Sequence, residues 1–318
     1  MKRALLLVAA ALTACGGTQT LTADEARNAM PSTSQAQLGT PQGGQALTAA
    51  GSAASGVTTA DYEQDTVALS TAVNLGVAWP LGVLEVVTAL PPTSCASDTC
   101  TWGPGSSALD FNTWQITVTK QAANDYLWTM QGKSKSDPGA TWTSFVTGEA
   151  FTTSLKHVGH GAFVVDLDAA AALARPTTDT PQTGKISCTY DNTSGQNVSV
   201  QFIGTQDSTV PSQKVNAAYE FAASTTGGDM QIATRNLTTG AELQLHSRWT
   251  DVGAGRADAS FADPSTAATY TRSECWSGAA TLFNLTYEST TPPVATDFGV
   301  EAADCVFTPA ALPTITIP

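Results

Sequence analysis

Charged side chains are scarce in this chain, and basic ones are scarcest. Only 13 % of the 318 residues are charged, with 14 Lys and Arg against 27 Asp and Glu, for a net charge of −13 at pH 7. No segment concentrates Lys or Arg, so the chain lacks the electrostatic footprint of a nucleic-acid-binding protein. Apolar residues make up 42 % of the chain. That content is enough for a buried core and excludes wholesale disorder.

Catalytic signatures are also missing. The sequence contains no G-x-S-x-G and no H-E-x-x-H motif, and no S-x-x-K has its companion motifs. We therefore expect no cofactor and favour a non-catalytic protein. A hydrolase whose Asp or His residues converge only in three dimensions is the alternative.

Histidine is rare, with three residues in the chain. His157 and His160 flank two residues in a glycine-containing stretch, which predicts a solvated loop. A mononuclear metal site is the alternative, with further ligands from Glu149, Asp166 and Asp168. The third, His246, is interpreted as a surface histidine. Near Gly253-Ala254-Gly255, the expectation is a turn with Asp251, Arg256 and Asp258 as surface charges, and weak calcium binding by the two aspartates is the alternative.

The first 17 residues have the pattern of an export signal. Lys2 and Arg3 precede a nine-residue apolar run, Ala4–Leu12, which is far shorter than the roughly 20 residues that cross a bilayer. The run Leu12-Thr13-Ala14-Cys15 resembles the lipobox of bacterial lipoproteins. The resemblance implies that residues 1–14 are removed and that Cys15 carries acyl chains as the first mature residue. Gly16 in place of aspartate then implies sorting to the outer membrane, so we expect a lipid-anchored protein of the cell envelope.

Residues 15–60 are predicted to form a disordered tether. Gly, Ser, Thr, Ala and Gln dominate there, and such residues bury too little apolar surface to offset the entropy of ordering. Thr22 and Glu25 have capping-box spacing, which permits only a short helical turn. A flexible linker of about 45 residues would reach about 35 to 40 Å.

Residues 61–318 are predicted to form one domain that begins with a helix. Apolar residues between Asp65 and Leu90 recur at helical spacing, with Pro80 inside the run. The length also fits a membrane span, but Asn74, Pro80 and Glu85 would lie within the bilayer. A pair of short buried strands is the third reading.

After Gly103 the apolar residues alternate with polar ones almost to the end of the chain. Trp114, Ile116 and Val118 form one such run, and Tyr126, Trp128 and Met130 follow across a turn at Asn124, which predicts a hairpin. Similar runs lie near 186–190, 198–202, 215–221, 230–232, 243–245 and 283–287. Only Leu167–Ala174 interrupts them with a short helix. The predicted fold is α+β, mainly antiparallel: a many-stranded meander or half-barrel packed on the N-terminal helix. This arrangement is similar to the half-barrels of lipoprotein carriers.

Five cysteines besides Cys15 would meet an oxidising compartment after export. The short spacing of Cys95 and Cys100 favours a local bridge. Cys188 alternates with apolar residues and is the candidate free thiol, which leaves Cys275 to pair with Cys305.

Seven tryptophans are distributed along the chain. They are expected mainly in the core, with Trp102, beside Gly103-Pro104-Gly105, as the exposed one.

Together these features predict a membrane-anchored, non-catalytic envelope lipoprotein whose β-rich domain binds an apolar ligand or an envelope protein. A structural or adhesive surface protein is a further alternative.

Overall fold

The computed structural model describes residues 20–41 and 60–318, apart from 108–109, 138, 154, 156, 176–180, 207–209, 211, 279–283, 292–296 and 314. The predicted leader, Cys15 and residues 42–59 of the predicted tether lie outside the described residues.

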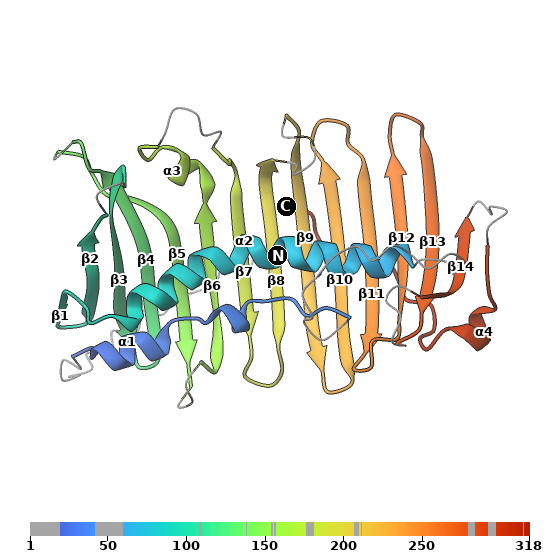
Figure 1. Cartoon of the computed structure of the whole chain (residues 1–318), viewed down its shortest axis with the longest axis horizontal. Helices are drawn as coiled ribbons and strands as arrows, with labels where there is room; N and C mark the ends of the chain where they lie inside the picture. The colour runs from blue at the N-terminus through green and yellow to red at the C-terminus, as the bar shows by residue number, and fades with distance from the viewer. Residues whose placement is uncertain are drawn as a thin grey trace, which may run out of the picture.

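Within the described residues the chain forms one open sheet of fourteen strands (Figure 1). Their order in the sheet is their order in the sequence, and every neighbouring pair is antiparallel. The strands are β1 Ser94–Ala96, β2 Thr99–Gly105, β3 Asn112–Ala122, β4 Asp125–Ser134, β5 Thr143–Thr152, β6 Gly159–Asp166, β7 Lys185–Asp191, β8 Asn197–Gln206, β9 Lys214–Ser224, β10 Gly227–Asn236, β11 Glu242–Thr250, β12 Gly255–Asp263, β13 Ala268–Trp276 and β14 Leu285–Thr291. The helical segments are α1 Ala23–Ala29, η1 Thr33–Gln35, α2 Asp61–Ala89, α3 Leu167–Ala171 and α4 Glu301–Asp304. The predicted α+β meander is confirmed.

The long helix α2 lies across the strands on one face of the sheet (Figure 1). It is long and apolar enough to cross a membrane by length and composition. Its buried face nevertheless packs on the sheet through residues at helical spacing, including Val73, Val77, Leu81 and Leu84. In this structure α2 is therefore the core helix that the sequence predicted.

A carboxylate from the sheet caps the start of α2. The N-cap residue is Ala60, which has no side-chain acceptor. Instead, Glu274 of β13 accepts a hydrogen bond from the Tyr62 backbone N–H through Oε2 at 2.8 Å. Arg272 pairs with Glu274 and, at 3.1 Å, with Asp61. Burial outweighs these partners and raises the pKa of Glu274 to about 7.

Glycines face tryptophan rings across neighbouring strands at four places in the described sheet. The directly paired residues are Gly132 with Trp114, Gly148 with Trp128, Gly228 with Trp249, and Gly255 with Trp276. A Cβ at any of the four glycines would lie 2.3 to 2.7 Å from the nearest ring atom of the tryptophan with which that glycine is paired. The missing side chain thus provides the space that each indole occupies.

Residues 20–41 are ordered, so the predicted flexible tether is wrong over this range. Thr22 caps α1 by accepting from the Glu25 N–H, and Asn74 of α2 holds both backbone polar groups of Leu38, at 2.7 and 2.9 Å. Ala26 and Ala36 are fully buried. Small side chains permit close approach of this segment, which runs beside α2 on the same side of the sheet (Figure 1).

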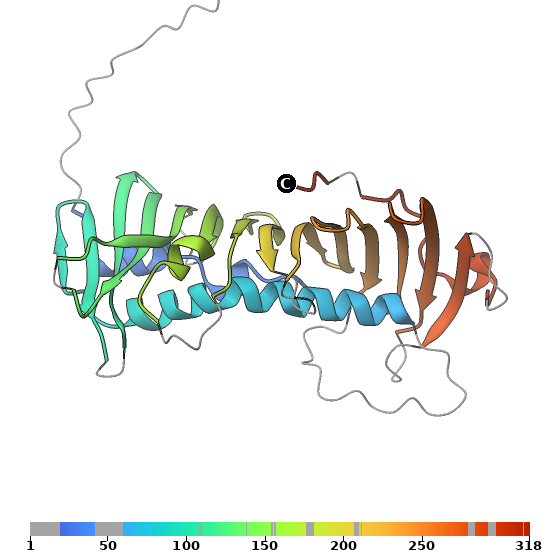
Figure 2. The same cartoon turned by 90° about the horizontal axis from the view of Figure 1, so that it is seen from above.

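The end of the chain lies on the other face of the sheet (Figure 2). Adjacent residues of β11 point to opposite faces. Ser247 meets Thr66 of α2, with their hydroxyl oxygens 2.9 Å apart, whereas Arg248 donates to the Thr308 carbonyl at 2.5 Å. We refer to residues 305–318 as the C-terminal segment.

Candidate functional site: an apolar pocket beside the long helix

A pocket of about 680 Å³ lies between the second half of α2, strands β2 to β5 and the α3 region. Its apolar walls comprise Trp79, Val83, Val87, Leu90, Pro91, Trp102, Trp114, Ile116, Met130, Phe145, Ala170 and Leu173. This volume falls in the range of small-molecule sites, roughly 300–1,000 Å³. The pocket is therefore large enough for a small apolar ligand or part of an acyl chain.

Three aromatic side chains form one wall of the pocket. The Phe145 ring is stacked with Trp79 of α2 at 6.5 Å between centroids and meets Trp114 of β3 edge-on at 5.5 Å. Phe145 is buried, whereas both tryptophans remain partly exposed. The wall thus offers aromatic faces from the helix and the sheet to anything that enters.

Hydrogen bonds hold the remaining walls in place. Trp102 donates from Nε1 to the Leu90 carbonyl at 2.9 Å, which satisfies a carbonyl at the end of α2. Asn112 of β3 binds both backbone polar groups of Ala174, accepting at 3.1 Å and donating at 2.7 Å. The helix end and the α3 region are therefore fixed to the sheet on both sides of the pocket.

Charge is nearly absent from the pocket. Among the described residues that line it, Asp110 is the only charged one, and its Oδ2 accepts from the Ser107 N–H at 2.6 Å. A hollow of similar size, about 600 Å³, has several charged or titratable side chains in its lining, including His160, Asp191 and Glu220. The pocket beside α2 is the better match to an apolar ligand.

Trp102 is a correction to the sequence analysis, because it is not exposed. It lies within β2 with 3 % of its surface accessible and forms part of the pocket wall. The pocket itself was not predicted, since its residues come from five separate stretches of the chain, 79–93, 102–116, 130–131, 145 and 170–173. The one signal in the sequence is the apolar run that predicted α2, because Trp79, Val83 and Val87 of that run line the pocket.

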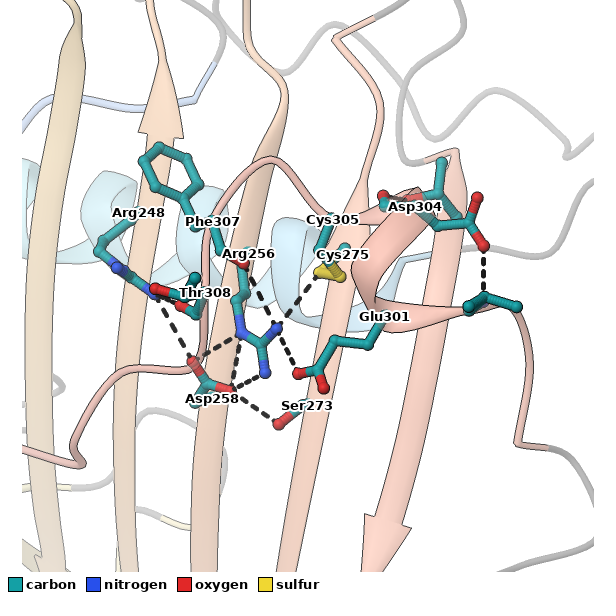
Figure 3. Close-up of a disulfide and its surroundings, with 12 residues drawn as sticks. Arg248, Arg256, Asp258, Ser273, Cys275, Glu301, Asp304, Cys305, Phe307 and Thr308 are labelled. Atoms are coloured by element: carbon teal, nitrogen blue, oxygen red, sulfur yellow. Dashed lines mark hydrogen bonds and ion pairs between the residues drawn. A yellow bond between two sulfur atoms is a disulfide. The ribbon is translucent and has the colours of Figure 1, made fainter.

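A second site, which is polar and was missed by the sequence analysis, lies beneath the C-terminal segment. Arg256 and Asp258 are buried rather than surface charges, and they belong to β12 rather than to a turn. The Arg256 guanidinium donates to Asp258 at 2.7 and 3.0 Å and pairs with Glu301 at 2.7 Å (Figure 3). Asp258 also accepts from Ser273 at 2.7 Å and from the Ala310 N–H at 3.1 Å. Burial opposes ionisation of Asp258, but these bonds hold its pKa below the ordinary value.

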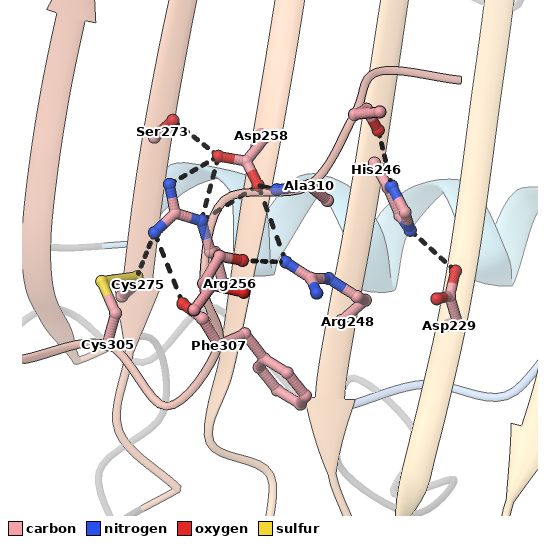
Figure 4. Close-up of polar contacts among 12 residues, drawn as sticks. Asp229, His246, Arg248, Arg256, Asp258, Ser273, Cys275, Cys305, Phe307 and Ala310 are labelled. Carbon is pink, nitrogen blue, oxygen red and sulfur yellow. Dashed lines mark hydrogen bonds and ion pairs between the residues drawn. A yellow bond between two sulfur atoms is a disulfide. The ribbon is translucent and has the colours of Figure 1, made fainter. Parts of the chain in front are cut away.

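His246 extends this row of contacts, so the expectation of a solvated surface histidine is wrong. Its Nδ1 lies 2.9 Å from the Ala311 carbonyl, and its Nε2 lies 2.9 Å from Asp229 (Figure 4). Burial opposes protonation, but the two acceptors outweigh it and raise the pKa of His246.

The site beneath the C-terminal segment serves to hold that segment. Both ring nitrogens of His246 already have partners, so the imidazole has no free nitrogen with which to activate a nucleophile. The Arg248 guanidinium covers the Phe307 ring at 5.1 Å. These contacts fasten the chain end to the sheet and do not form a catalytic constellation.

The alternative metal site is not assembled among the residues that the structure describes. Asp166 caps α3 and pairs with Lys185 at 2.8 Å, and Asp168 accepts from the Gly184 N–H at 3.0 Å. His160 belongs to β6 instead of a loop and stacks on Phe151. Over the described ranges, no three His, Cys, Asp or Glu side chains are placed to hold a metal ion, which also applies to the calcium alternative.

Both predicted disulfides are present. Cys95 and Cys100 are bridged across the β1–β2 hairpin, and Cys275 of β13 is bridged to Cys305 (Figure 3). Cys188 is free and buried in β7, and burial raises its thiol pKa to about 12. The second bridge fixes the start of the C-terminal segment beside Arg256.

Comparison with protein-family models, curated proteins and solved structures found no match to this chain.

Proposed function

We propose that this protein is a lipid-anchored lipoprotein of the cell envelope, held in the outer membrane through Cys15, and that its sheet domain binds an apolar ligand without catalysis. The pocket beside α2 carries the proposal. It is apolar and partly open, and two of the aromatic rings that line it, Trp79 and Trp114, keep some exposed surface. A closed core would have buried those rings completely.

The sheet does not resemble an empty half-barrel along its whole length, because α2 and residues 20–41 cover much of one face (Figure 1). The space for a ligand is limited to the pocket of about 680 Å³. We therefore propose a small apolar ligand or a single acyl chain and not a large lipid assembly.

Intact-mass measurement of the membrane-extracted protein tests the anchor. We expect a chain that begins at Cys15 and carries acyl groups, and we expect Cys15→Ser to lose them. A protein that retains residues 1–14, or a Cys15 without acyl groups, would overturn the proposed attachment.

A pocket-filling variant tests the ligand site. Gly105 lines the pocket, and a Cβ there would meet no atom within 4 Å. Gly105→Leu should displace the volume of about two ligand methylenes, each contributing about 0.8 kcal/mol, which weakens binding by about tenfold. Gly82→Leu is the matched control, because a Cβ at Gly82 also meets open space and Gly82 does not line the pocket.

The full-length protein in lipid nanodiscs would be titrated with a fluorescent fatty acid, with energy transfer from tryptophan as the signal. Wild type and Gly82→Leu should bind the probe alike, and Gly105→Leu should bind it about tenfold more weakly. Equal binding by all three proteins, or no binding by wild type, would rule out the pocket as the ligand site.

A further inference from the structure

The outward side of α2 carries an exposed apolar stripe along its second half. The stripe consists of Leu75, Trp79, Val83 and Val86, and it ends with Leu90 at the C-cap of the helix. The steps between these residues are three or four positions, so they share one side of the helix. Their exposed fractions range from 41 to 70 %. A row of large apolar side chains of this length on a solvent-facing helix indicates a contact surface.

The stripe carries no charge, and it occupies only one end of α2. Glu85 is the single charged residue between positions 66 and 90, and it turns to residues 20–41, accepting from the Thr33 N–H at 2.5 Å and from its hydroxyl at 3.0 Å. The exposed residues in the first half of α2 are polar or small, such as Asp61, Gln64 and Ala68. The apolar surface is therefore confined to the second half of the helix, which runs toward the end that lies over β2 to β5.

The chain enters the fold at this same end. The Leu21 N–H donates to the Ser97 carbonyl in the β1–β2 turn at 2.8 Å, and Arg27 donates to the Thr88 and Leu90 carbonyls at 2.6 and 3.0 Å. Cys15 precedes Leu21 by six residues. Six extended residues span at most about 20 Å. An anchor at Cys15 therefore keeps this end of the domain close to the lipid headgroups.

We propose that the apolar stripe of α2 rests on the bilayer in which Cys15 is anchored. This inference rests on the proposed lipidation. The occupant is a lipid surface, because the anchor brings that surface within reach and the stripe is uncharged. With a net charge of −13, the chain gains nothing from anionic headgroups, so the contact depends on insertion of apolar side chains.

Two other covers for the stripe are less suitable. Residues 42–59 contain only two large apolar residues, Leu47 and Val57, against five in the stripe. A second copy of the chain could cover the stripe without an anchor, and the resulting dimer would then form in solution in the absence of a membrane. Trp79, Val83 and Leu90 belong both to the stripe and to the pocket wall, so a bilayer contact also places the pocket mouth at the source of acyl chains.

Quenching by brominated lipid tests the contact. The acylated full-length protein would be reconstituted on phosphatidylcholine vesicles with brominated acyl chains, and tryptophan fluorescence would be measured. Trp79 lies in the stripe, so wild type should be quenched, and Trp79→Phe should lose most of that quenching. Val86→Glu should reduce the quenching by at least about half, because a carboxylate in the stripe opposes insertion. Ala68→Glu, on the exposed polar half of α2, should leave it unchanged.

The outcomes separate this inference from the proposed function. Acylated protein whose tryptophans are not quenched, or whose quenching survives both Trp79→Phe and Val86→Glu, would overturn the bilayer contact and leave the anchor intact. Protein that intact mass shows to be unacylated would overturn the anchor itself. Protection of Trp79 from an aqueous quencher that rises with protein concentration in the absence of vesicles would assign the stripe to a second copy and would also overturn the proposal.

Discussion

A single methyl group added at Gly148 tests the pairing of glycines with tryptophan rings. Gly148 of β5 lies directly opposite Trp128 of β4, and a Cβ there would lie 2.4 Å from the indole. Trp128 is 1 % exposed and packs on Phe163 at 5.9 Å between ring centroids, so the ring has no free space to move into. Overpacking of this kind costs about 1 to 3 kcal/mol. For a domain of this size, each kcal/mol lowers Tm by about 2 to 4 °C. We expect Gly148→Ala to lower Tm by about 2 to 12 °C.

The same chemical change in α2 serves as the control. A Cβ at Gly82 meets no atom within 4 Å, and Ala is preferred to Gly inside a helix by about 1 kcal/mol. Gly82→Ala should therefore raise Tm slightly, whereas Gly148→Ala lowers it. Scanning calorimetry and urea unfolding followed by tryptophan fluorescence would measure both. Unchanged stability of Gly148→Ala, or a loss of equal size in both variants, would refute the role assigned to the glycine.

Three further predictions concern the Cys275–Cys305 disulfide and two titratable side chains. Replacing both Cys275 and Cys305 by Ser should lower the free energy of unfolding in urea by about 4 kcal/mol, since the bridge closes a loop over a separation of 30 residues; a loss below about 1 kcal/mol would contradict this. Because the pKa of Glu274 is raised to about 7, wild type should lose up to about 3 kcal/mol of stability as the pH rises from about 4.5 to 7, and Glu274→Gln should remove that slope in urea titrations at several pH values. Because the pKa of His246 is raised, the stability that its protonated ring contributes is present below pH 6.5. This stability is lost as the pH rises through the folded-state pKa. Hydrogen exchange at Ala311 and its neighbours, corrected for intrinsic rates, should speed up over that range in wild type but not in His246→Gln.

The regular part of the fold could be predicted because its signals are local. The β3–β4 hairpin follows from alternation on both sides of Asn124, which adopts a positive φ of 63° at the turn. Helix α2 follows from a long run of apolar residues at helical spacing. Each of these patterns needs only neighbouring residues to be recognised, so sequence alone was sufficient.

Strands with buried charge could not be predicted in the same way. Arg256 and Asp258 are two positions apart and therefore lie on the same face of β12. Their burial depends on Glu301 and on the backbone at Phe307 and Ala310, about 50 residues later in the chain. A local pattern of charge and glycine favours a turn, and only the C-terminal segment makes burial of the ion pair favourable. The i, i+2 spacing of opposite charges was the one signal that could have suggested a strand.

Composition misled the prediction for residues 20–41 for a physical reason that also bears on function. Small residues usually indicate disorder because they bury little area, yet Ala26 and Ala36 are buried since their size permits close approach to α2 and the sheet. Order from Leu21 onward shortens the connection to Cys15 from the predicted 45 residues to six. The maximum reach falls to about 20 Å, so the proposed anchor at Cys15 would hold the domain near the headgroups at the end where the apolar stripe and the pocket lie. A protein built to act far from the membrane would gain nothing from ordering that segment, whereas one that takes an acyl chain from the bilayer needs its pocket at that distance.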